Sequence, residues 1–76
     1  MIYIFSNKYF DELLKVFPNA LKGEVYGMKY IELENSEFLA SYLANLAGGQ
    51  TKMYEDFLKE NNYIHLEAFA NICTHM

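Results

Sequence analysis

The residues near the end of this sequence carry its most reactive side chains. Cys73 and His75, together with His65 and Glu67, offer the thiolate, imidazole and carboxylate groups that bind zinc. A structural zinc site needs four such ligands at a recognisable spacing, whereas the chain has one cysteine and two histidines. The pattern favours the ordinary interpretation, in which Cys73 is a small core residue and His75 is solvated. We therefore expect no metal site and no cofactor.

The sequence offers equally little for catalysis. A cysteine nucleophile needs an adjacent base and a third group that orients this base, and no third group accompanies Cys73 and His75. The adjacent acidic pairs at 11–12 and 55–56 cannot cooperate on a helix, because neighbouring helical side chains do not face each other. We predict no catalytic residues and no enzymatic activity.

A glycine pair before a possible helix start raises the question of phosphate binding. Gly48 and Gly49 precede Thr51 and Lys52, and helix N-termini attract anions. In a phosphate-binding loop of the Walker type, however, the glycines follow a strand and the lysine precedes the threonine. A glycine stop for one helix and a threonine cap for the next explain the same residues.

Composition narrows the class of protein further. The 76 residues are 53% hydrophobic and 21% charged, with a net charge of −4 and no arginine. This length predicts one globular domain, 1–76. A negative chain without arginine lacks the usual means of binding phosphates and guanine, so we expect no direct nucleic-acid partner. We also expect no membrane segment and no signal peptide, and the single cysteine agrees with a cytoplasmic location, in the host cytoplasm if a phage encodes the chain.

Hydrophobic periodicity predicts a small α+β fold. Residues 2–5 are expected to form a strand buried on both faces, followed by a helix that ends before Pro18. A second strand at 24–33 precedes helices at 37–47 and 52–60. The segment 63–75 fits either a C-terminal helix, which we favour, or a short strand at its start. The expected order is roughly β-α-β-α-α-α, with the helices packed on one face of a short sheet.

The segment 24–33 contains an internal glycine. Gly27 indicates either a bulge or a tight turn that would split the segment into a hairpin. We predict one bent strand. It places Tyr26, Met28 and Tyr30 on one face, and Val25, Ile31 and Leu33 on the other.

Tyrosine is in surplus once the helix faces have supplied a core. If the helices cover the opposite face, Tyr26, Met28 and Tyr30 are exposed and available to a partner, because tyrosine and methionine are enriched at interfaces. The alternative is that this face is the covered one. Acidic side chains lie beside the triplet and could meet a basic groove on a partner, or could simply be solvated. These are Glu24, Glu32, Glu34 and Glu37.

Two functional hypotheses follow. The first is a small acidic non-enzymatic protein that binds and inhibits or modulates a larger protein, as phage or mobile-element proteins of the anti-CRISPR kind do with host defence or nucleic-acid enzymes. The second is a self-associating structural or regulatory subunit, such as a homodimer, because oligomerisation is a common way for a small chain to bury enough surface.

Overall fold

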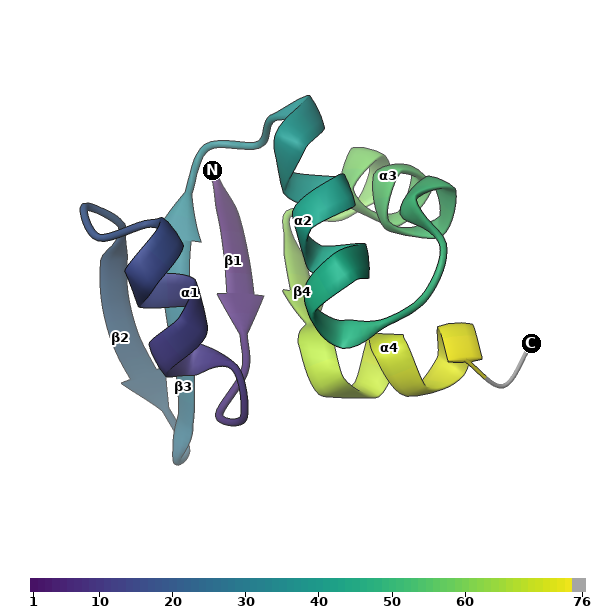
Figure 1. Cartoon of the computed structure of the whole chain (residues 1–76). Coiled ribbons are helices and arrows are strands. Elements are labelled where there is room, and N and C mark those ends of the chain that lie inside the picture. Colours follow the sequence, from purple (N-terminus) through teal and green to yellow (C-terminus); the bar gives the residue numbers. More distant parts are fainter. Residues whose placement is uncertain (75–76) are drawn as a thin grey trace.

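The computed structural model describes residues 1–74, which form four strands and four helices (Figure 1). The predicted α+β class is confirmed. In chain order the elements are β1 (Ile2–Phe5), α1 (Phe10–Val16), β2 (Leu21–Val25), β3 (Met28–Leu33), α2 (Glu37–Ala47), α3 (Thr51–Glu60), β4 (Tyr63–His65) and α4 (Leu66–Thr74).

The strands form one mixed sheet in the order β2-β3-β1-β4. Strand β3 is antiparallel to both β2 and β1, whereas β4 runs parallel to β1. The register places Ile4 opposite Ile31 on one side and Ile64 on the other. All three are fully buried, so they mark the face of the sheet that carries the core.

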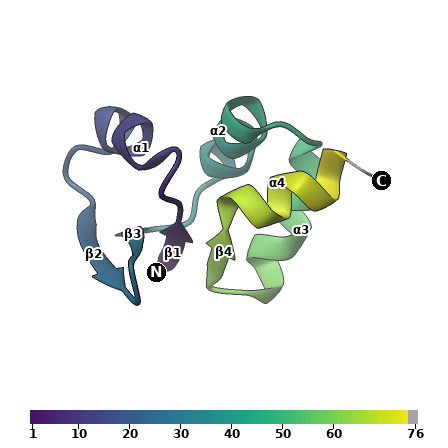
Figure 2. The same ribbon diagram turned by 90° about the horizontal axis from the view of Figure 1, so that it is seen from below.

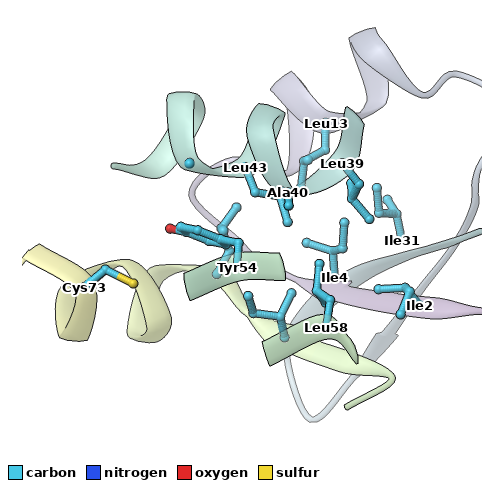
Figure 3. Close-up of a cluster of buried hydrophobic side chains, with 13 residues drawn as sticks. Ile2, Ile4, Leu13, Ile31, Leu39, Ala40, Leu43, Tyr54, Leu58 and Cys73 are labelled. Atoms are coloured by element: carbon cyan, nitrogen blue, oxygen red, sulfur yellow. The ribbon is translucent and has the colours of Figure 1, made fainter. Parts of the chain in front are cut away.

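Helices α1 and α2 lie on this core face, while α3 and α4 pack beyond the β4 edge (Figures 1 and 2). Among residues 1–74, no helix lies over the opposite face of β2, β3 and β1 (Figure 2). Figure 3 shows how the isoleucines of β1 and β3 meet Leu13, Leu39 and Leu43 from the helices, with Tyr54 and Leu58 closing the cluster from α3. We call the uncovered side of the sheet the open face.

The helix boundaries follow from local sequence signals. Pro18 lies just after α1, and Gly48 ends α2 in a conformation with φ of 92°, which glycine adopts without steric cost. The Ser6 hydroxyl accepts a hydrogen bond from the backbone N–H of Tyr9 at 2.9 Å, just before α1. None of the helices within residues 1–74 has both the length and the apolar character needed to cross a bilayer.

The predicted bent strand at 24–33 is wrong, because the segment belongs to a hairpin. Tyr26 and Gly27 form its two-residue turn, with φ of 52° and 79°. Two positive φ values are typical of the type I′ turn, whose twist matches that of paired strands. The turn also changes which residues share a face: Val25 lies opposite Met28 and therefore on the open face, not beside Ile31 as predicted.

The predicted element order also needs a second correction, at residues 63–75. Both predicted possibilities occur in succession, because β4 adds three residues to the edge of the sheet and α4 follows at once. Strand β1 differs as well from the predicted strand buried on both faces: Ile2 and Ile4 are buried, but Tyr3 and Phe5 are only partly buried, because none of the helices in the described part of the chain covers their side.

Candidate protein-binding face

The strand pairings assign a row of large side chains to the open face. Residues directly opposite in neighbouring strands share a face, and Phe5 is paired with Tyr30, which is paired with Gly23. Extending this alternation along every strand defines the open face. Its members are Tyr3, Phe5, Leu21, Gly23, Val25, Met28, Tyr30, Glu32, Tyr63 and His65.

Tyr30 lies at the centre of this face. Its ring centroid is 5.8 Å from that of Tyr3, in an edge-to-face arrangement, and 5.2 Å from that of Phe5. On the other side its ring lies against Gly23, where an added Cβ would be only 2.5 Å from the Tyr30 hydroxyl oxygen. The glycine therefore makes room for the tyrosine to lie flat toward β2, and aromatic contacts fix it from the β1 side.

Around Tyr30 the face is hollowed. A shallow depression of about 560 Å³ is lined by Tyr3, Phe5, Val25 and Tyr30, and by Asn62, Tyr63 and His65 near β4. Tyr63 is 52% exposed, and its ring is 6.4 Å from that of Phe57 on α3. Val25 is 44% exposed at the opposite rim. The open face thus presents aromatic and aliphatic groups that a partner could cover.

Charged groups are scarce on this face. Glu32 is its one carboxylate, and His65 is engaged locally because its Nδ1 accepts a hydrogen bond from the Ala68 backbone N–H at 3.1 Å. Lys29 lies on the other side of the sheet, with its ammonium group 5.3 Å from the centre of the Phe10 ring. An aromatic centre with few charges is the composition found in the cores of protein–protein interfaces.

The structure separates the tyrosines that the sequence placed together. Met28 and Tyr30 lie on the open face and are half-buried, while Tyr26 lies at the tip of the hairpin turn with its side chain fully exposed. The four predicted acidic residues are also dispersed. Glu32 is on the open face, Glu24 is exposed on the other side of β2, Glu34 follows β3, and Glu37 begins α2.

The residues that could bind a metal or act as a nucleophile take part in hydrogen bonding and core packing. Glu67 accepts hydrogen bonds from the Ser6 hydroxyl and the Asn7 backbone N–H, and so connects the start of α4 to the end of β1. Cys73 is buried, and its desolvation raises the pKa of the thiol. Within residues 1–74, no three His, Cys, Asp or Glu side chains are grouped so that they could hold a metal ion. His75 lies outside the described residues.

The glycine pair considered for phosphate also has a packing role. The Gly48 carbonyl oxygen accepts a hydrogen bond of 2.7 Å from the hydroxyl of the buried Tyr54. Gly49 lies so close to α4 that an added Cβ would be 2.8 Å from that of Cys73. These contacts join the turn between α2 and α3 to the core.

Sequence reasoning missed Tyr3, Phe5, Val25 and Tyr63 as members of the face. One signal was present in β1, where isoleucine alternates with an aromatic residue over Ile2–Phe5. Alternation of this kind indicates two different environments, one for each face of the strand.

Comparison with protein-family models, curated proteins and solved structures finds no match to this chain.

Proposed function

We propose that this chain is a non-enzymatic protein that binds a larger protein through its open face and thereby modulates or inhibits that partner. The observation that carries the proposal is the uncovered aromatic face, with Tyr30 at its centre and a hollow of about 560 Å³ around it. Apolar patches of this kind on a small domain mark interaction surfaces.

The shape of the face favours a protein over a small molecule. Small-molecule sites are concave and enclose most of the ligand, whereas the hollow around Tyr30 is shallow and open on the sheet surface. Tyrosine and phenylalanine rings supply large contact areas with little conformational freedom to lose, which suits a broad protein contact.

Nucleic acid is the main competing ligand for a sheet with exposed aromatic rings. Bases stack on such rings in several nucleic-acid-binding folds, but those folds also present basic groups that hold the phosphates. Here the open face carries Glu32 and no lysine, and the chain has no arginine and a net charge of −4. These charges repel a phosphate backbone and favour a protein partner with a basic surface.

To test the proposal, the wild-type chain is immobilised and a lysate of the native host is passed over it to capture the partner. The affinity of the purified partner is then measured for the wild type and for variants of the open face. Tyr30→Ser and Tyr63→Ser remove two aromatic groups from the face. Each should weaken binding by roughly tenfold or more, since central aromatic residues dominate interface energetics. Phe38→Ser is the control matched to Tyr63→Ser, because Phe38 is an aromatic residue with 57% exposure against 52% for Tyr63, and it lies on α2, off the open face.

Far-ultraviolet circular dichroism of each variant shows whether the fold is retained. A partner that binds the wild type and the Phe38→Ser variant, but neither open-face variant, supports the proposal. Equal binding by all four chains would refute the role of the open face. Binding of a single-stranded oligonucleotide by the wild type, lost in Tyr30→Ser, would replace the protein partner with a nucleic acid.

A further inference from the structure

Strand β2 is the free edge of the sheet. It pairs with β3 on one side, and no other strand within residues 1–74 pairs with its outer side (Figure 1). Four of its five residues are exposed, including Leu21 at 64% and Val25 at 44%. An edge strand with exposed apolar side chains is a template for pairing with another strand, unless charges or bulges prevent it.

The backbone groups available for pairing can be identified from β3. Lys29 directs its backbone away from β2, because its N–H donates to the Asn7 side chain and its carbonyl oxygen accepts from the Ser6 N–H. In an antiparallel pair the opposite residue does the same on its own side, and Lys29 is opposite Glu24. Glu24, and by alternation Lys22, therefore direct their N–H and carbonyl groups toward the free edge.

The sequence of β2 is self-complementary about its middle residue. It reads Leu-Lys-Gly-Glu-Val. In a two-fold symmetric antiparallel pair centred on Gly23, Lys22 of each copy lies opposite Glu24 of the other, and Leu21 lies opposite Val25. Centring the pair on Lys22 or on Glu24 would also join the outward backbone groups, but would bring like charges together at the centre. Only the register centred on Gly23 pairs opposite charges.

We propose that two copies of this chain associate through β2, forming one continuous antiparallel sheet across a two-fold axis at Gly23. A prime marks a residue of the second copy. Each Lys22 and Glu24′ would exchange backbone hydrogen bonds and form an ion pair on the helix side of the sheet, where both side chains are exposed in the isolated chain. Leu21 and Val25′ would meet on the open face. Charge complementarity and apolar pairing thus occur in the same register.

Gly23 suits the centre of such an interface. The two central residues form a non-hydrogen-bonded pair, in which the Cα atoms approach to about 4.5 Å. The Tyr30 ring already occupies the space over Gly23 in each copy, so the two Tyr30 rings would flank the two-fold axis. Dimerisation covers Leu21 and Val25 at the rim of the open face but leaves its aromatic centre uncovered, so the dimer does not depend on the proposed function.

The association is measured by sedimentation over total concentrations from about 1 µM to 1 mM, because one strand pair is a small interface and its affinity is expected to be weak. Wild-type protein should convert from monomer to dimer in this range. Amide hydrogen exchange adds a local readout: the amides of Lys22 and Glu24 should become protected as concentration rises. A chain that stays monomeric, or a dimer in which these amides stay unprotected, would overturn the proposal.

Charge reversal tests the register. Lys22→Glu and Glu24→Lys each place like charges at both cross-strand pairs, and each should weaken dimerisation by about tenfold or more. The double variant Lys22→Glu/Glu24→Lys restores opposite charges and should return to within roughly threefold of wild type. An equimolar mixture of the two single variants should form a heterodimer, because both of its cross-strand pairs are then attractive.

The matched controls make the same changes of net charge on α3. Lys59→Glu and Glu55→Lys are exposed substitutions outside β2 and should leave dimerisation unchanged. If a control weakens association as much as its β2 counterpart, net charge and not strand pairing explains the effect, and the proposal fails. All of these side chains lie off the open face, so binding of a partner there would be lost or kept independently of the dimer.

Discussion

The hairpin turn offers a substitution that should stabilise the chain. Tyr26 has φ of 52° and Gly27 has φ of 79°, the pattern of a type I′ turn. A left-handed conformation costs a residue with a large side chain roughly 1–2 kcal/mol, and asparagine is the residue that best tolerates it at this turn position. The Tyr26 side chain is 104% exposed, so its removal sacrifices no packing in the isolated chain. Tyr26→Asn should therefore raise the free energy of unfolding.

The expected gain is about 0.5–1 kcal/mol, because asparagine relieves only part of the cost. In a domain of this size each kcal/mol moves Tm by about 4–8 °C, so Tm should rise by roughly 2–8 °C. Thermal melts followed by circular dichroism, together with urea titrations, give both quantities. Tyr26→Phe is the control, since it keeps the ring and the backbone cost and should melt with the wild type.

If Tyr26→Asn melts at or below the wild-type temperature while Tyr26→Phe is unchanged, the positive φ of Tyr26 does not destabilise the chain and the reasoning is refuted.

The Tyr26→Asn variant also tests the sequence prediction that Tyr26 contacts a partner. Weaker partner binding by a chain that is more stable than wild type could not come from unfolding. It would assign the loss to the side chain at the tip of the hairpin.

Two further predictions concern the contacts around α3. Tyr54→Phe should cost about 1 kcal/mol, because it removes the hydrogen bond from the buried Tyr54 to the partly buried Gly48 carbonyl oxygen. Burial raises the pKa of Tyr54 to about 12 from 10.0, with smaller contributions from Cys73 and Tyr9. The stability that comes from this raised pKa is complete below about pH 10 and is lost as pH rises toward 12. Urea titrations across this range should show a steeper decline in the free energy of unfolding for wild type than for Tyr54→Phe. Gly49→Ala should cost roughly 1–3 kcal/mol more than Gly48→Ala, because both glycines have positive φ but only Gly49 would place a Cβ within 2.8 Å of the Cys73 Cβ. Equal urea midpoints for the two alanine variants would contradict that reasoning.

The helices were the most predictable part of this chain. Their apolar side chains recur at helical spacing, and their ends carry residues that stop a helix, such as Pro18 and Gly48. Such signals lie within a few residues of one another, so they can be seen without knowledge of the tertiary structure.

The strands were harder to predict because their evidence is spread over distant residues. The hairpin turn is Tyr-Gly, which lacks the asparagine or aspartate that usually announces a type I′ turn. Strand β4 has three residues and depends on its parallel pairing with β1, about sixty positions earlier in the chain. A pairing of this kind leaves almost no local pattern, which explains why the sequence favoured a helix over a short strand for the segment 63–75.

The turn at Tyr26 and Gly27 determines both candidate interaction surfaces. A single strand over 24–33 would have placed Val25 in the core with Ile31, and its far edge would have been formed by other residues. The hairpin instead brings Gly23 opposite Tyr30, so that the ring can lie against the glycine at the centre of the open face. It also makes β2 the outermost strand, with the backbone N–H and carbonyl groups of Lys22 and Glu24 directed toward the free edge. One two-residue turn therefore creates the aromatic face and the self-complementary edge together, and a substitution that loosened it would weaken both.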